Sequence, residues 1–249
     1  MSPPARFSNV PFDKLFPHFI GRQDELAAIK AALSVIAGDK PTRYVIYGSQ
    51  GVGKSQLMIQ FAKTCYEEYR YPYIFWISAT SVDKITREYE QIYDSLIHTE
   101  SIRFNQFDKL TAARRWLEQC DADWLLIFDN VEHTTLEFVK RYLPQSNKSG
   151  HGRIVFTTIA KSLAEVLAPV SEMQNRTFEL ETPNVKNAGE MLLKQFEGDV
   201  MSVDKVESLV TEIGCLPLAI THAATFMMET GKSLDHTLEL YKNHKYSVR

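Results

Sequence analysis

A glycine-rich stretch of the chain has the composition of a phosphate-binding loop. Gly48-Ser49-Gln50-Gly51-Val52-Gly53-Lys54-Ser55 matches the pattern G-x-x-x-x-G-K-[ST]. Glycines let backbone N–H groups approach a polyphosphate, and the N-terminus of a following helix directs further N–H groups at the same oxygens. We expect the Lys54 ammonium to contact the β and γ phosphates and the Ser55 hydroxyl to ligate Mg²⁺. The predicted phosphate and metal contacts here are Gly48, Gly51, Val52, Gly53, Lys54, Ser55 and Gln56.

A second candidate site residue ends an apolar run downstream. The run 124–128 is followed by Asp129. Ligands of a parallel sheet lie beyond the carboxyl ends of its strands, so Asp129 is expected beside the loop as a second Mg²⁺ ligand. The next residue is Asn130, whose carboxamide can orient water but cannot accept its proton. We therefore take Lys54, Asp129 and Asn130 as the candidate catalytic residues and expect slow hydrolysis, with the reach of Glu132 left open.

Strands and helices must alternate to bring these residues together. Short apolar runs predict buried strands at 44–47, 73–77, 124–128, 154–157 and 177–180, and helical spacing predicts helices at 54–69, 82–97, 108–120, 132–142 and 161–168. After Pro183 only helices are predicted, at 184–196, 203–213, 217–230 and 233–243. The pattern indicates an α/β P-loop NTPase fold, a parallel sheet flanked by helices, followed by a small all-helical domain. We expect an N-terminal linker or arm at 1–19, a nucleotide-binding domain at 20–182 and a helical domain at 183–249.

Composition restricts the class of protein further. Of the 249 residues, 44% are hydrophobic and 24% are charged, and the formal net charge is −3, so nucleic acid is an unlikely partner. The three cysteines favour neither a disulfide framework nor a zinc site. The N-terminus lacks the apolar core of a signal peptide, and the apolar runs are too short to cross a bilayer. These features predict a cytoplasmic protein with no membrane partner.

Several motifs together resemble a known family. Besides the loop and the segment 125–130, they are Ile20-Gly21-Arg22, Gly214-Cys215-Leu216-Pro217-Leu218-Ala219 and, in part, 154–158. In these motifs the chain resembles the NB-ARC class of STAND signal-transduction ATPases, found in NOD-like receptors of innate immunity. The resemblance implies that ADP or ATP is bound, with Ile20, Arg22 and Pro217 at the adenine and ribose. It also implies that Thr157 and Thr158 sense the γ-phosphate.

The family pattern is not followed everywhere. The family usually has an arginine after the paired threonines, where this chain has Ile159. Arg153 would lie at the other end of the strand, about 16 Å from Thr158 at ~3.3 Å per residue, so it cannot easily replace that arginine. Lys161 is a weak substitute, and His222 is interpreted as structural. These departures favour a slow timer over a rapid enzyme.

Three functions fit these observations. The first is a nucleotide-operated signalling switch within a larger intracellular receptor, with winged-helix and sensor-repeat domains as partners and a nucleotide-dependent homo-oligomer as its active form. The second is a turnover P-loop enzyme, an AAA+-like motor or a kinase. Against a kinase, segment 145–152 is too short for a mobile lid and contains no arginine. The third is a scaffold that binds nucleotide only for stability.

Overall fold

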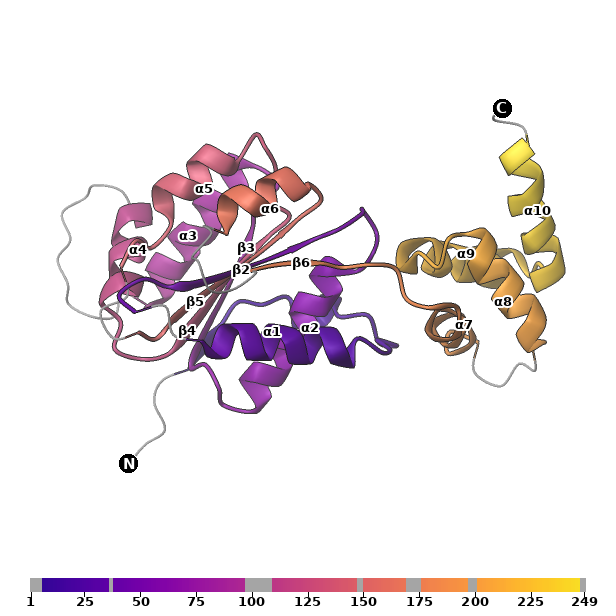
Figure 1. The fold of residues 1–249 in the computed structure, drawn as a ribbon, viewed down its shortest axis with the longest axis horizontal. Helices are drawn as coiled ribbons and strands as arrows, with labels where there is room; N and C mark the ends of the chain where they lie inside the picture. The colour runs from indigo at the N-terminus through magenta and orange to yellow at the C-terminus, as the bar shows by residue number, and fades with distance from the viewer. Residues whose placement is uncertain are drawn as a thin grey trace.

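The computed structural model describes residues 6–35, 38–96, 109–146, 150–168, 176–196 and 201–246. Figure 1 shows two parts side by side, a sheet covered by helices on both faces and a bundle of helices beyond strand β6. The chain leaves the sheet part after β6 and continues into the bundle. This arrangement confirms the predicted fold class of a parallel sheet flanked by helices and followed by a helical domain.

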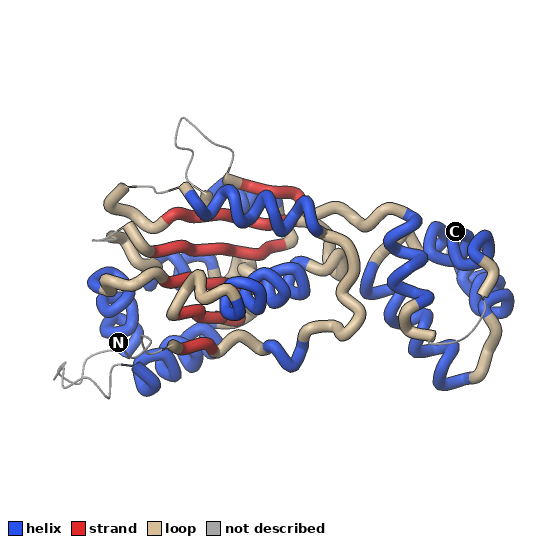
Figure 2. Tube along the Cα trace, turned by 90° about the horizontal axis from the view of Figure 1, so that it is seen from below, coloured by secondary structure: helices blue, strands red, loops and turns tan. Residues whose placement is uncertain are grey.

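The sheet has six strands in the order β1-β3-β4-β5-β2-β6, and every neighbouring pair is parallel. The strands are β1 (Phe7–Ser8), β2 (Thr42–Tyr47), β3 (Tyr73–Ser78), β4 (Trp124–Asp129), β5 (Gly152–Thr158) and β6 (Thr177–Glu179). The central strands are nearly continuous apolar runs because both of their faces are covered. In β4, for example, Leu126 and Phe128 face one core and Leu125 and Ile127 face the other. Figure 2 shows the strands lying next to one another between the helices.

The helices divide between the two faces of the sheet. Helices α1 (Gln23–Ser34) and α2 (Lys54–Glu67) cover one face. The other face is covered by α3 (Val82–Leu96), α4 (Lys109–Gln119), α5 (Leu136–Tyr142) and α6 (Lys161–Leu167). Each face therefore has its own apolar core, and the sheet separates the two cores.

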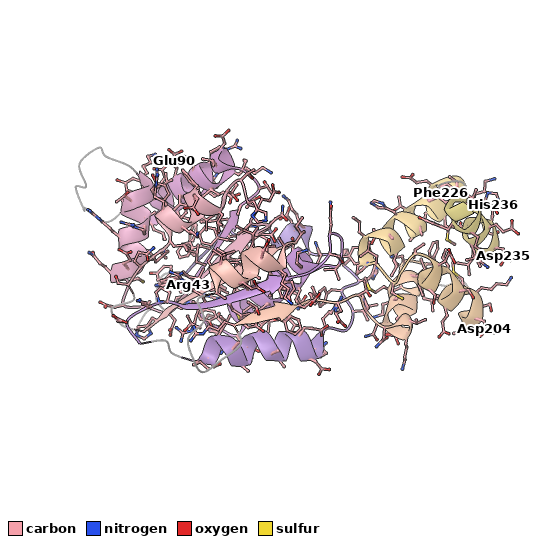
Figure 3. All side chains as sticks on the ribbon, turned by 45° about the horizontal axis from the view of Figure 1, so that its top comes forward. Arg43, Glu90, Asp204, Phe226, Asp235 and His236 are labelled. Carbon is pink, nitrogen blue, oxygen red and sulfur yellow. The ribbon has the colours of Figure 1, made fainter. Side chains whose placement is uncertain are left out.

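The helical part has a third core. It consists of α7 (Val185–Leu193), α8 (Val203–Glu212), α9 (Pro217–Thr230) and α10 (Leu234–Tyr246). Its buried side chains include Leu192, Leu209 and Ile220, and Ile20 packs against them although it precedes α1. Figure 3 places Asp204, Phe226, Asp235 and His236 on this part, away from the sheet. Among the described residues after Pro183 no strand occurs, as the sequence predicts.

Two local differences from the predicted elements have clear causes. Helix α5 begins at Leu136 and not at 132, because Thr135 closes a turn by donating from its backbone N to Glu132 O and from Oγ1 to Ala79 O. The N-terminal arm contributes the short edge strand β1 and a 3-10 helix, Phe12–Lys14. Positions 97 and 108, at the ends of the predicted helices 82–97 and 108–120, lie outside the described residues.

No helix in the described ranges combines the length and the apolar composition needed to cross a membrane.

Candidate functional site

A cavity of about 580 Å³ lies where the phosphate loop, the N-terminal arm and the helical part meet. Most of the predicted site residues line it, namely Ile20, Arg22, Gly51, Val52, Gly53, Lys54, Ser55, Gln56, Asn130, Thr157 and Pro217. They come from four separate stretches outside the helical part, around Ile20, the phosphate loop, Asn130 and Thr157, and from the first turn of α9. The volume falls within the range of small-molecule and cofactor pockets, which is roughly 300–1,000 Å³.

The loop directs backbone donors and one ammonium group into this cavity. Gly53 adopts a left-handed conformation with φ of 101° immediately before helix α2, so the helix N-terminus opens on the cavity. The Nζ of Lys54 donates to Gly48 O at 2.8 Å and to Ser49 O at 2.9 Å. Burial lowers the pKa of Lys54, and the charge of Asp129 opposes this effect. The ammonium is thus held against the loop within reach of the cavity.

Ser55, Asp129 and Thr157 form one hydrogen-bonded cluster. Ser55 Oγ donates to Asp129 Oδ1 at 2.8 Å and Oδ2 at 2.9 Å, and Thr157 Oγ1 donates to Oδ1 at 2.7 Å. Burial raises the pKa of Asp129, while the two hydroxyls and Lys54 lower it. A hydroxyl lying against both oxygens of one carboxylate is a set of hard oxygen ligands that fits Mg²⁺. Asp129 itself lies behind the residues that line the cavity.

Asn130 lies at the edge of this cluster with its side chain held from one end. Its backbone φ is 60°, and its N–H donates to Thr157 Oγ1 at 2.8 Å. Its Nδ2 donates to Glu132 Oε1 at 3.0 Å. Glu132 therefore reaches Asn130, which answers the question of reach that the sequence left open. One N–H of the amide is engaged by Glu132, and the carboxamide oxygen can accept a hydrogen bond from water.

Arg22 lines another side of the cavity and is bonded to three segments of the chain. Arg22 donates to Glu181 O at 2.8 Å, to Val52 O at 3.3 Å and to Glu25 Oε1 at 2.7 Å. Its guanidinium therefore links the start of α1 to the loop and to the connection that leads into the helical part.

Helix α9 contacts the phosphate loop directly. The backbone N of Leu218 donates to Gly51 O at 3.2 Å. Gly51 has φ of 80°, and a Cβ built there would lie 2.9 Å from Leu218 Cβ. Leu216 packs against the core beneath the loop. The first turn of α9, which contains Pro217, thus lies on the loop itself.

Several predicted residues have other surroundings. Thr158 is fully buried and donates to Val131 O at 2.8 Å, and it does not line the cavity. Arg153 lies at the opposite end of β5 and donates to Leu33 O, Gly150 O and Gly152 O. It therefore does not replace the arginine that the family usually has at the position of Ile159. His222 is exposed on α9.

One wall of the cavity consists of residues that the sequence did not predict as site residues. Residues 13–17 and Phe19 line it, together with Gln50, Ile159, Pro183, Met191, Leu218 and Thr221. The prolines and the lack of helical period in the arm indicated an irregular segment. The remaining signal was the high proportion of aromatic residues, with Phe7, Phe12, Phe16 and Phe19 in a short stretch.

A further carboxyl group, Glu88 on α3, lies near this edge of the sheet. It accepts a hydrogen bond from the backbone N of Ser78, the residue paired with Asp129 across β3 and β4. Burial raises the pKa of Glu88 from 4.5 to about 7, and Asp129 adds to the effect, while the Ser78 bond, Lys84 and Arg87 oppose it. Its neutral form is thus favoured by folding, and the stability it provides is lost as the pH rises toward 7.

Glu88→Gln is therefore expected to make stability less dependent on pH. Glutamine keeps the acceptor for Ser78 N but carries no charge. Wild type and variant should have similar Tm values near pH 4.5, and the variant should be the more stable at pH 8. Thermal denaturation across this pH range measures the difference. Glu90→Gln on the same helix is the control, and a Glu88→Gln variant that loses stability equally at both pH values would contradict the assignment.

Comparison with known proteins places these features in a family. A family model described as NB-ARC domain matches residues 22–184. A curated relative from Hyaloscypha variabilis, described as a nucleotide-binding leucine-rich repeat (NLR)-like protein, is 26% identical over 250 residues. That alignment covers 92% of this chain and 24% of the relative, so the chain spans about a quarter of the relative's length.

Solved structures support the fold at lower identity. A STAND protein with a tetratricopeptide repeat sensor from Pyrococcus horikoshii superposes with a TM-score of 0.51 at 18% identity, covering 81% of this chain and 29% of that one. The ORC2 protein of Aeropyrum pernix, solved as ADPNP–ADP complexes, gives 0.57 at 17% identity, covering 93% and 70%. The family model spans well over half of the chain, and the resemblance seen in the sequence is confirmed: the chain belongs to the NB-ARC domain family.

Proposed function

We propose that this chain binds ADP or ATP with Mg²⁺ in the cavity at the phosphate loop and acts as a nucleotide-operated switch within a larger receptor. The observation that carries the proposal is the convergence of Lys54, Ser55 and Asp129 at the mouth of helix α2, beneath a cavity of about 580 Å³. Family membership and the name of the Hyaloscypha relative, a nucleotide-binding NLR-like protein, support it.

The residues that would hold the phosphates and the metal fit these groups chemically. Lys54 would exchange its bonds to Gly48 O and Ser49 O for phosphate oxygens, and the free N–H groups at the start of α2 would bind the same oxygens. Ser55 and Asp129 would hold Mg²⁺, which in nucleotide sites is held by few protein ligands together with phosphate oxygens. Among the described residues no cluster of three or more His, Cys, Asp or Glu side chains competes for a metal ion.

The proposed contacts at the base and ribose come from both parts of the molecule. Ile20 and Arg22 would contact them from the sheet part, and Pro217 from the helical part. We propose the division into units 20–182 and 183–249 on the same grounds, with 1–19 as an arm. A ligand that touches both units stabilises the arrangement in which they approach, and exchange of ADP for ATP would shift the balance through Thr157, which contacts Asp129.

Slow hydrolysis is part of this proposal. The carboxamide of Asn130 can position a water through its free oxygen, but it cannot take up the proton. Glu132 holds Asn130 and is not itself among the residues lining the cavity. Ile159 stands where the family usually has an arginine. Near the end of β5, none of the residues that line the cavity adds a positive charge to that of Lys54. A switch that hydrolyses on the order of 10⁻³ s⁻¹ or slower fits these groups.

A turnover enzyme is the second candidate, because the structures that resemble this chain include an ORC2 protein with bound nucleotides. Cytoplasmic location, a role in innate immunity, oligomer formation and partners such as winged-helix and sensor-repeat domains remain proposals that follow from the family.

The deciding experiment is to denature the purified protein and identify the nucleotide released, then to measure phosphate release with MgATP. We expect ADP or ATP in the released fraction and slow turnover. Finding no nucleotide, together with no uptake of added MgADP, would overturn the proposal. Release of several phosphates per second without a partner would instead favour the turnover enzyme.

A further inference from the structure

The N-terminal arm, residues 6–19, forms a wall of the nucleotide cavity with its last part only. Six residues of the segment 13–19 line the cavity, all except His18. The earlier part of the arm lies elsewhere, as an edge strand beside β3. The arm thus connects the edge of the sheet with the cavity. At both places it contacts residues that lie far from it in the sequence.

The earlier part of the arm is held by several independent contacts. Phe7 and Ser8 pair with Tyr73 and Ile74 of β3. The Asn9 side chain exchanges two hydrogen bonds with the backbone of Trp76, at 2.7 and 3.0 Å. The ring of Phe12 lies 5.8 Å from that of Tyr66 on α2. None of these contacts involves the cavity.

The last part of the arm is held by the apolar packing of Leu15 and Phe19 and by one polar side chain, that of Gln56. Gln56 Oε1 accepts from Phe16 N at 2.7 Å, and Gln56 Nε2 donates to Lys14 O at 3.0 Å. Among the described residues these are the only side-chain hydrogen bonds made to the backbone of residues 13–19. Gln56 also lines the cavity and directly follows Ser55 in the first turn of α2. Both ends of its amide are engaged with the arm.

We propose that Gln56 couples nucleotide binding to the docking of residues 13–19 against the cavity. The conformation of the arm would then depend on whether the site is occupied. The inference rests on the proposed function. Nucleotide in the cavity would contact the docked wall, and the two hydrogen bonds of the Gln56 amide would in turn favour docking. By linkage, whatever undocks the arm lowers nucleotide affinity by the same factor by which nucleotide favours docking.

The coupling can be measured by hydrogen–deuterium exchange and by MgADP titration on the wild-type chain and on Gln56→Leu. In the wild type, MgADP is expected to slow exchange of the backbone amides in 13–19 as well as in the phosphate loop. In Gln56→Leu, affinity for MgADP should fall about tenfold, the factor by which a docked arm favours the nucleotide. At saturating MgADP the loop should stay protected while 13–19 exchanges faster than in the wild type.

Gln60→Leu is the matched control. It makes the same substitution one turn along α2, where, within the described part of the chain, the Gln60 side chain donates only to Thr64 Oγ1 of its own helix, at 3.4 Å. It should bind MgADP and protect the arm as the wild type does. If the wild type binds MgADP without any protection of 13–19, or if Gln56→Leu protects the arm fully, the coupling is wrong. Failure of the wild type to bind MgADP would instead overturn the proposed function, which keeps the two ideas distinguishable even if the variant does not fold.

Discussion

Lys54→Ala is expected to remove the stabilisation that MgADP gives to this protein. In the wild type the ammonium is buried and hydrogen-bonded to two loop carbonyls, so it is already oriented toward the cavity. A hydrogen bond to a charged group contributes about 1.5–3 kcal/mol, and a polyphosphate would receive more than one. We therefore expect Kd for MgADP to rise by about 100-fold or more. At millimolar MgADP the increase in Tm that we expect for the wild type should be nearly absent in the variant.

The comparison must be made between ligand-free and ligand-bound samples of each variant. Removing Lys54 also leaves Gly48 O and Ser49 O without their partner, so the ligand-free Tm can itself fall. Lys63→Ala, the same substitution further along α2, does not touch the cavity and should keep the full MgADP response. An undiminished response in Lys54→Ala would mean that the anion is bound elsewhere.

Gly152→Ala is expected to destabilise the fold through lack of space. A Cβ at Gly152 would lie 2.3 Å from Trp124 Cζ2 and 2.7 Å from Cη2. The two residues are partners across β4 and β5, and the indole is fully buried, so the ring cannot move aside. Overpacking of this kind costs about 1–3 kcal/mol. Chemical denaturation should show a lower midpoint with an unchanged slope.

Gly189→Ala provides the opposite expectation. Gly189 lies inside helix α7, and a Cβ there would meet Val206 Cγ1 at 3.4 Å, an ordinary contact. Alanine favours the helix over glycine by up to about 1 kcal/mol, so this variant should be neutral or more stable.

The cause of the Gly152 effect is tested by adding Trp124→Leu. If the double variant is not more stable than the sum of the single changes predicts, the steric explanation fails.

The sheet part was predictable because its strands are buried on both faces. Runs such as 124–128 are apolar without interruption, and each is followed by a helix of clear period. The family motifs then located the cavity, and Ser55, Asp129 and Asn130 lie together as expected. The helical part followed from the absence of strand patterns and from Pro217, which begins α9.

What escaped prediction depends on contacts that leave no periodic pattern. Strand β1 has two residues and is held by backbone pairing and by Asn9. The role of Gln56 depends on where the arm returns in space, which no local spacing encodes. Thr157 and Thr158 are adjacent, yet alternation along β5 places only the first at the cavity.

The contact between Gly51 and Leu218 gives a meaning to a position that the loop pattern leaves unspecified. Of the glycines in the loop, the pattern fixes only Gly48 and Gly53. Gly51 has no side chain where the start of α9 contacts it, and its φ of 80° is a conformation that glycine adopts without strain, so the helix and the loop conformation both favour glycine. In related chains that lack a helical domain here, only the loop conformation would favour it. A bulkier residue at 51 would strain the loop and push against the first turn of α9, which would favour separation of the two units.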